Sequence, residues 1–329
     1  MKAITFDRIG TPDTVLQLSE VPIPDIKDDE VLIRITAASI NPGDFLFIQN
    51  LYPEPKRPVF PHQIAGNHGA GIIEKAGKAV HLKPGAHVAF SYLNTWAEYV
   101  AVPAAWLIPL PADYPAELSS QFVNLITAWD LLKQSGVQPG QWLALTAGNS
   151  AVSTLVSQLA KQQGVNTIAI VRRVKEPRLL ESLGATAVID LSVEQGNITQ
   201  RILEITGNKG LNGIIDNVGG PVTGELIRCS DFGSRLIING GMSEEKYELH
   251  NFDILLKGLQ IQSHVYRYFF TPPLPEDLPL LKKIAAASAG FVSNVSGIHA
   301  LEDFKTAIDE SIRYPEKGKH IFRGLDVIN

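Results

Sequence analysis

The chain has 329 residues, of which 45% are hydrophobic and 19% charged, and its formal net charge is −5. This length is large for one hydrophobic core and predicts two domains, and the composition is that of an ordinary globular protein. The Lys and Arg residues are scattered and form no basic stripe, which argues against a nucleic-acid partner.

The single cysteine, Cys229, excludes an internal disulfide and a cysteine-built zinc cluster within one chain. The first ten residues, MKAITFDRIG, alternate like a strand and lack the basic and apolar regions of a signal peptide. No apolar run approaches the roughly 18 residues of a membrane span. We therefore expect a cytoplasmic protein with no membrane partner.

Residues 1–118 are rich in short β-like runs, such as residues 30–40 and 62–77, with Pro and Gly between them. This texture predicts a small all-β domain with irregular loops. The spacing of apolar residues changes near residue 119. Residues 116–136 carry apolar side chains at helical spacing and end at Gly136, which predicts a helix that stops there.

Residues 142–240 alternate between strand-like and helical runs. Strands are expected at 142–147, 167–171, 184–190, 212–218 and 234–240, and helices at 150–164, 193–206 and 221–230. Such alternation predicts an α/β domain with a parallel sheet covered by helices on both faces. We place this domain at 119–256. The tail, 257–329, holds two more helical stretches and is expected to return to the first domain.

Residues 143–155, LALTAGNSAVSTL, predict a strand, a turn and a helix start. The pyrophosphate of a dinucleotide binds N–H groups at such a helix N-terminus, and only the closest approach requires glycine. We assign cofactor contacts to Gly148, Asn149, Ser150, Ala151 and Val152. An ordinary strand-to-helix turn, with a serine as the N-cap of the helix, explains residues 143–155 equally well.

The next strand ends in AIVRRVKEPR, residues 169–178, with Arg172 and Arg173 at its tip. An NAD site carries an acid there for the ribose 2′-hydroxyl. A carboxylate would repel a 2′-phosphate, whereas a guanidinium pairs with it. The alternative, a solvated start of the following helix, leaves the missing acid unexplained. The sequence therefore predicts NADPH as the cofactor.

Eight stretches match, in order, the motifs of one known family: residues 38–44, 66–80, 83–90, 96–103, 127–132, 147–153, 216–220 and 239–242. The chain resembles the medium-chain dehydrogenase/reductases, in particular their zinc-free quinone reductases and 2-enoyl thioester reductases. The GNSAV turn is most similar to the mitochondrial-type enoyl reductases. The resemblance implies a GroES-like β domain, a doubly wound Rossmann domain, an active-site cleft between the two, and a homodimer joined through the Rossmann domains.

The same resemblance assigns further cofactor contacts. Thr127 matches a threonine that contacts the nicotinamide end in relatives, although it could be a helix-surface hydroxyl. The remaining matched positions lie in the DNVGG and NGGM stretches, and they are Asn217, Gly240, Gly241 and Met242.

Zinc-dependent family members hold a catalytic metal with a cysteine, a histidine and an acid. Here the first stretch has Asn41 and no thiol, and Asn67-His68 stands where those members carry His-Glu. An amide is a poor zinc ligand, so we predict no metal in this position. His62 and His68 are interpreted as surface or satisfied core residues.

Without a metal, hydride transfer needs an acceptor that is already activated, such as a quinone, an enone or an enoyl thioester. Charge develops on the acceptor's oxygen, so the protein must supply donors and a proton. Tyr52 matches the tyrosine that the enoyl thioester reductases use as proton donor, and Asn41 and Asp44 are expected to face nicotinamide and substrate. The alternatives are a lid role for Tyr52 and an Asx turn around Pro42.

The sequence thus predicts a zinc-independent NADPH oxidoreductase that acts on a small molecule and reduces a quinone or an activated C=C bond. One alternative is a trans-2-enoyl thioester reductase of fatty-acid metabolism. An alternative of another class is a non-catalytic NADPH-binding protein.

Overall fold

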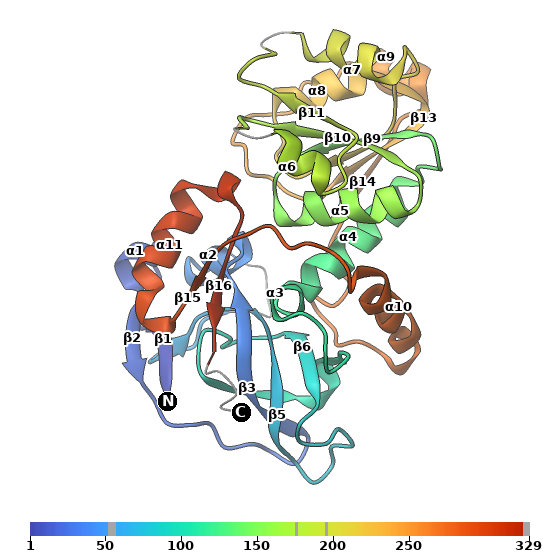
Figure 1. Cartoon of the computed structure of the whole chain (residues 1–329). Helices are drawn as coiled ribbons and strands as arrows, with labels where there is room; N and C mark the ends of the chain where they lie inside the picture. The colour runs from blue at the N-terminus through green and yellow to red at the C-terminus, as the bar shows by residue number, and fades with distance from the viewer. Residues whose placement is uncertain (52–56, 175–176, 195–196, 325–329) are drawn as a thin grey trace. The chain divides into compact units, whose positions relative to one another are not determined.

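The computed structural model describes residues 1–51, 57–174, 177–194 and 197–324. The chain divides into two compact units, each with its own β-structure (Figure 1). Unit 1 comprises Met1–Val123 and Arg267–Asn329, and unit 2 comprises Asn124–Tyr266. Unit 2 extends beyond residue 256 because β14 (Gln260–Ser263) pairs in parallel with β13 (Ser230–Ile238).

The sheet of unit 2 has six parallel strands in the order β11-β10-β9-β12-β13-β14. Besides β13 and β14, these strands are β9 (Trp142–Thr146), β10 (Asn166–Val171), β11 (Ala187–Asp190) and β12 (Leu211–Asp216). This is the doubly wound order in which the chain runs outward in opposite directions from two central strands, here β9 and β12. The predicted α/β fold with a Rossmann-type sheet is confirmed.

Helices cover both faces of this sheet, with α5 on one face and α7 and α8 on the other (Figure 1). The helices of unit 2 after its first are α5 (Ala151–Gln162), α6 (Pro177–Ser182), α7 (Ile198–Thr206), α8 (Pro221–Arg228) and α9 (Asn251–Lys257). Ile202 and Leu226 pack from α7 and α8 into a buried cluster with Ile170 and Ile214 of the sheet. Burial of the amphipathic faces explains why these runs fold as helices.

The helical run at 116–136 is divided in two, α3 (Ala116–Ser119) and α4 (Phe122–Ser135). The hydroxyls of Ser119 and Ser120 donate to the carbonyls of Ala116 and Glu117, three residues earlier, at 2.8 and 3.1 Å. Serine side chains that bond the local backbone compete with the helix ladder, so the interruption falls at these serines.

Unit 1 is mostly antiparallel. A small sheet has the order β2-β1-β4, and a seven-stranded sheet has the order β15-β16-β3-β5-β6-β8 with β7 paired to β3. Its strands are β1 (Lys2–Phe6), β2 (Gln17–Glu20), β3 (Glu30–Ser39), β4 (Gln63–Ile64), β5 (His68–Ala76), β6 (His87–Ser91), β7 (Tyr99–Pro103), β8 (Leu107–Pro109), β15 (Val295–His299) and β16 (Lys319–Arg323), and its other helices are α1 (Pro12–Val15), α2 (Pro42–Ile48), α10 (Leu278–Ser288) and α11 (Phe304–Arg313). The core of this unit includes Phe6, Phe47, Trp96 and Phe322.

The C-terminal segment joins the first sheet through β16, which pairs antiparallel to β3 with Ile321 opposite Ser39. The amide of Ile40 also donates to the carbonyl of His320, at 3.0 Å. This register brings Lys319 beside Ile40, the residue that directly follows β3.

Candidate active site

Asp44 anchors the predicted site in unit 1. Its side chain is fully buried, and its two carboxylate oxygens accept the backbone N–H groups of Asn41, at 2.7 Å, and Asn67, at 2.8 Å. Asn41 is the N-cap of α2, with Pro42 at the first helical position. The carboxylate therefore holds the end of β3 and the start of β5 together, which is a positioning role for Asp44.

The Asn41 side chain lies between two polar groups. Its Nδ2 donates to Ser39 Oγ at 2.9 Å and lies 3.2 Å from His68 Nδ1. Ser39 Oγ in turn donates to the carbonyl of Ser120, at 3.0 Å. His68 is thus part of the cluster that Asn41 forms, and the sequence interpretation, which set this histidine aside, missed that contact.

Lys319 is a second residue that sequence reasoning missed. Its Nζ donates to the carbonyl of Ile40 at 2.9 Å. Burial lowers the pKa of the Lys319 ammonium to about 8, and the negative charge of Asp44 opposes part of that shift. Only the register between β16 and β3 reveals this neighbour, because the two residues are far apart in the sequence.

Asn67 has a buried side-chain amide whose nitrogen and oxygen both lack a hydrogen-bond partner among the described residues. Its backbone is satisfied, since its N–H bonds Asp44 and its carbonyl accepts from Tyr92 at 2.9 Å. An unsatisfied buried amide is costly, so this side chain is a group that a bound ligand or water would satisfy. Tyr52, the predicted proton donor, lies outside the described residues.

In unit 2 the predicted phosphate turn follows β9. Ala147 has a φ of 47°, and the amide of Gly148 donates to the carbonyl of Ile170 on β10 at 2.9 Å. A Cβ on Gly148 would lie 2.7 Å from the Cα of Ala169. Glycine is required here by the close packing of the turn against β10, a role that differs from the approach to phosphate expected from the sequence.

Ser150 is the N-cap of α5, and its Oγ accepts the N–H of Ser153 at 3.2 Å. The first N–H groups of a helix have no partner within the helix. Ala151 and Val152 provide such donors at this end of α5, together with the favourable end of the helix dipole. The turn contains the N–H groups that an anionic group requires.

Asn217 connects the ends of β9 and β12 at the centre of the sheet. Its Nδ2 donates to the carbonyl of Thr146 at 2.9 Å and to Ser153 Oγ at 3.1 Å, and its Oδ1 accepts from Asn239 at 2.6 Å. In doubly wound sheets the ligand crevice opens at this switch point. Asn217 therefore fixes the start of α5 relative to both central strands.

Asp216, directly before Asn217, is a fully buried carboxylate that sequence reasoning did not single out. Its Oδ1 accepts from Thr146 Oγ1 at 2.7 Å and from the amides of Val218 and Gly219, both at 3.0 Å. Its Oδ2 accepts from Thr223 Oγ1 and the Tyr247 hydroxyl, both at 2.8 Å. Burial and this carboxylate together raise the pKa of Tyr247.

Arg172 and Arg173 follow β10 directly, and both are exposed. One acid that interacts with Arg173 is Asp190 at the end of β11. Burial alone would raise the pKa of Asp190, but bonds from Ser192 and Val174 and the charge of Arg173 lower it overall. Asp190 is thus an ionised structural acid that faces Arg173.

The remaining predicted cofactor residues lie on α4 and after β13. Thr127 is buried on α4, and Met242 is 70% exposed. The amide of Gly240 donates to the carbonyl of Asp216 at 3.2 Å, and a Cβ there would lie 2.4 Å from the carbonyl oxygen of Asn217. Gly240 therefore packs against the end of β12, whereas a Cβ on Gly241 would meet nothing within 4 Å.

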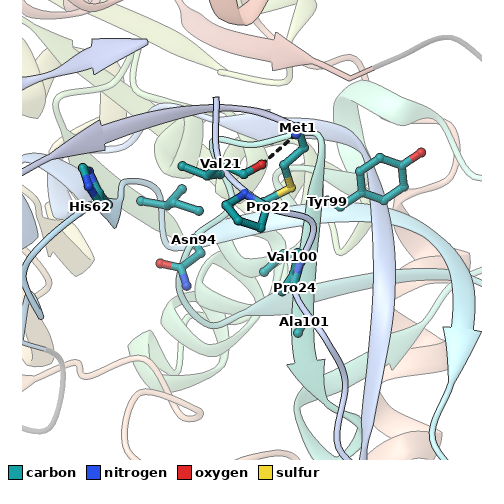
Figure 2. A pocket seen from close by; sticks show the side chains of 10 residues that line it. Met1, Val21, Pro22, Pro24, His62, Asn94, Tyr99, Val100 and Ala101 are labelled. Atoms are coloured by element: carbon teal, nitrogen blue, oxygen red, sulfur yellow. Dashed lines mark hydrogen bonds between the residues drawn. The ribbon is translucent and has the colours of Figure 1, made fainter. Parts of the chain in front are cut away.

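Figure 2 shows a hollow in unit 1 lined by Met1, Val21, Pro22, Pro24, His62, Ile64, Asn94, Tyr99, Val100 and Ala101. The amino group of Met1 donates to the carbonyl of Val21 at its edge, at 2.7 Å. The hollow contains none of the described residues that the sequence assigned to the site. We therefore do not place the chemistry there. Among the described residues, no helix has the length and apolar character that crossing a membrane requires.

Comparison with known proteins gives two family models along the chain. Residues 27–112 match the alcohol dehydrogenase GroES-like domain, and residues 151–283 match the zinc-binding dehydrogenase domain. The mitochondrial enoyl-[acyl-carrier-protein] reductase of Caenorhabditis elegans is 28% identical over 100% of this chain and 96% of its own length.

Two solved structures extend the comparison. A Bacillus thuringiensis protein described as an NADPH:quinone reductase has a TM-score of 0.84 at 26% identity, covering 98% of this chain and 99% of its own. The quinone oxidoreductase of Escherichia coli, solved with NADPH, has a TM-score of 0.85 at 23% identity, covering 98% of this chain and 100% of its own, and it supports the fold. With two matching domains in order and likeness over the whole length, the chain belongs to the zinc-independent branch of the medium-chain dehydrogenase/reductase family.

Proposed function

We propose that the protein is an NADPH-dependent oxidoreductase that reduces a quinone or an activated C=C bond by hydride transfer, without a catalytic metal. The observation that carries the proposal is the pair of exposed cations, Arg172 and Arg173, at the end of the strand beside the phosphate turn. A 2′-phosphate requires positive charge at this position, and an acid is absent from it.

The residues of unit 2 fit NADPH. The N–H groups of Ala151 and Val152 suit the pyrophosphate, and Arg172 suits the 2′-phosphate. Gly148 and Asn217 hold the turn and the two central strands in place. When bound, NADPH supplies the hydride, and the chain supplies binding and orientation.

The residues of unit 1 suit an acceptor that gains negative charge. The amide of Asn67 has unsatisfied donors, and Asp44 holds the Asn67 backbone in place. Neutral amide donors stabilise a developing enolate or quinol oxygen without a metal. Asn41 and Asn67 stand where metal-dependent relatives need thiolate and imidazole ligands, so we propose that no catalytic zinc is bound there.

A second candidate is the reduction of a trans-2-enoyl thioester. It is favoured by the whole-length likeness to an enoyl-[acyl-carrier-protein] reductase and by the Asn149-Ser150 turn. We also propose a homodimer joined through unit 2 and a cytoplasmic location, as the family resemblance and the single cysteine led us to expect.

Consumption of NADPH by the purified protein, with a panel of quinones, enones and enoyl thioesters, tests the function. Turnover with quinones and enones supports the first candidate, and strong preference for enoyl thioesters supports the second. Tight NADPH binding without turnover on any acceptor would identify the non-catalytic alternative.

Arg172→Ala tests the cofactor. A charge-assisted pair contributes about 1.5–3 kcal/mol, so the Kd for NADPH should rise about tenfold to a hundredfold, with little change for NADH. Fluorescence titration with both cofactors measures the difference. Arg173→Ala is the matched control and should have a smaller effect, because Arg173 faces the Asp190 carboxylate. Equal losses for NADPH and NADH would contradict the assignment.

Tyr52→Phe tests the proton donor that the family resemblance implies. The change removes one hydroxyl and should lower turnover of enones or enoyl thioesters by roughly 10²- to 10⁴-fold, with a smaller effect on quinones. If Tyr52 is a lid residue instead, Tyr52→Phe will change turnover very little, and only Tyr52→Ala will raise KM. Steady-state kinetics on both acceptor types separate the two roles.

A further inference from the structure

Three side chains with metal-ligand chemistry meet in the C-terminal part of unit 1. His299 ends β15, His320 lies on β16 and Glu310 lies on α11. One ligand atom from each lies within 4.8 Å of the other two. None of the three matches a motif position discussed above, and the proposed reduction does not use them.

The spacing of the ligand atoms is close to that of a metal site. His299 Nε2 and His320 Nδ1 are 2.9 Å apart, and His320 Nδ1 is 3.7 Å from Glu310 Oε2. Ligand bonds of about 2.0–2.2 Å in a tetrahedral zinc site place neighbouring ligand atoms roughly 3.3 Å apart. The two observed distances bracket that value, so small side-chain movements would complete the geometry.

The ring of His320 is already oriented for this role. Its other nitrogen, Nε2, lies 2.9 Å from Ser296 Oγ, and the side chain is 3% exposed. A polar partner on the second nitrogen fixes the orientation of a ligating imidazole and is the usual companion of a metal-bound histidine. The Glu310 side chain is 43% exposed, so the cluster has an open side for entry and for a solvent ligand.

Gly297 provides the space in front of the two rings. A Cβ at this residue would lie 2.4 Å from His299 Nε2 and 2.7 Å from His320 Nδ1. The register between β15 and β16 also shifts between Val295 and Gly297, so the pairing of the two strands is irregular beside the cluster. Any side chain at 297 would fill the position that the two nitrogens face.

We propose that His299, Glu310 and His320 form a binding site for a divalent transition metal of the zinc type, with one position left to solvent. Two imidazoles and one carboxylate are a ligand set that zinc uses, and neutral imidazole suits zinc, copper and nickel. Burial, and then the neighbouring His299, lower the pKa of His320. The ion would connect α11 to both C-terminal strands.

Without metal, the same two nitrogens share one proton in a hydrogen bond, with either ring as the donor. When metal binds, the ring that donates must shift its proton to its own other nitrogen, which is Nδ1 in His299 or, in His320, the Nε2 that lies beside Ser296 Oγ. The two states are therefore exclusive, and a direct measurement of bound metal distinguishes them.

The test uses the full-length chain without an affinity tag, stripped with a chelator and dialysed. Zn²⁺ titration by calorimetry and native mass spectrometry should give one ion per chain, and Co²⁺ should give the visible absorption bands of a low-coordinate site. The melting temperature should rise on adding Zn²⁺. None of these readouts depends on NADPH turnover, which should survive chelation.

Glu310→Gln removes one ligand at an exposed position, and Gly297→Ala keeps all three ligands but fills the space between the rings. Each should weaken Zn²⁺ binding by at least about a hundredfold. Ser296→Ala should weaken it by about tenfold to a hundredfold, since it removes only the orienting partner. The control, His62→Ala, disrupts an exposed His–Asp pair elsewhere in unit 1 and should change nothing.

Absence of a stoichiometric ion in the wild type would overturn the proposal. So would Zn²⁺ binding that Glu310→Gln leaves unchanged, because the histidines would then bind as ordinary surface imidazoles. Circular dichroism of Glu310→Gln verifies that any loss of binding is not a loss of fold.

Discussion

Each unit contains a fully buried carboxylate, Asp44 in the first turn of α2 and Asp216 at the end of β12, and the two carboxylates are satisfied in different ways. Asp44 in unit 1 accepts one backbone N–H on each oxygen and faces the Lys319 ammonium. Asp216 in unit 2 accepts two backbone N–H groups and the Thr146 hydroxyl on one oxygen, and two hydroxyls on the other. A buried charge needs compensation, and the chain provides it once with a cation and once with neutral donors.

The comparison shows which of the two carboxylates can be replaced by a different polar group. A backbone N–H can only donate, whereas a hydroxyl can rotate and accept instead. The two backbone N–H groups that bond Asp44 therefore both require an acceptor at this position. Asp216 has one oxygen whose partners, Thr223 and Tyr247, can adapt to a different group.

The largest expected effect is on Asp44→Asn. The new NH₂ group must face the N–H of Asn41 or Asn67, and Lys319 loses its anion. Breaking a buried pair of this kind costs about 3–5 kcal/mol, so the urea midpoint and melting temperature of unit 1 should fall sharply. Glu74→Gln is the control, because its pair with Arg34 is partly exposed and should contribute about 1 kcal/mol or less.

Asp216→Asn should lower the free energy of unfolding by less, about 1–2 kcal/mol. The amide can keep its oxygen toward the backbone N–H groups and turn its NH₂ toward the two hydroxyls. Removal of the carboxylate should also lower the pKa of Tyr247, which Asp216 helps to raise. Urea unfolding and ultraviolet titration of the tyrosines measure the two effects. A loss as large as that of Asp44→Asn would show that the two carboxylates are equivalent after all.

The smallest expected effect concerns pH. The pKa of Lys319 is lowered from 10.5 to about 8, so between those values the unfolded chain holds a proton that the folded chain has released. The free energy of unfolding should therefore rise with pH in that window, by up to about 1.4 kcal/mol per unit.

Comparison of the wild type with Lys319→Met isolates this contribution, because other titrating groups cancel in the difference. The wild type should gain about 1.5 kcal/mol relative to Lys319→Met between pH 8 and pH 9.5. A difference that stays flat would mean that Lys319 remains charged in the folded protein, paired with Asp44 as an ordinary ion pair.

Features that depend on local sequence were predictable. The alternation of strands and helices identified the Rossmann-type sheet, and Arg172 and Arg173 were located because they directly follow a recognisable strand. The break between α3 and α4 was not predicted, because local serine bonds outweighed the apolar periodicity there. Both outcomes follow from contacts a few residues apart.

Features that depend on pairing between distant segments were not predictable. The bond from Lys319 to Ile40 spans 279 residues, and the antiparallel register of β16 on β3 creates it. Asp216 was visible in the DNVGG stretch, but its hydroxyl partners come from β9, α8 and the Tyr247 loop. The spacing of residues along the sequence does not determine which strands are neighbours in a sheet.

The return of the chain to unit 1 affects how the protein is made. Residues 1–123 emerge from the ribosome first, yet β3 meets β16 only after residue 323 has been synthesised. During that interval unit 2, which is one continuous segment of the chain, can fold by itself. Residues 37–39 of β3 remain unpaired on the side that β16 later occupies. Synthesis from the N-terminus therefore completes unit 2 before unit 1, although unit 1 begins first. A ribosome that stalls before β16 is made leaves the edge of β3 exposed.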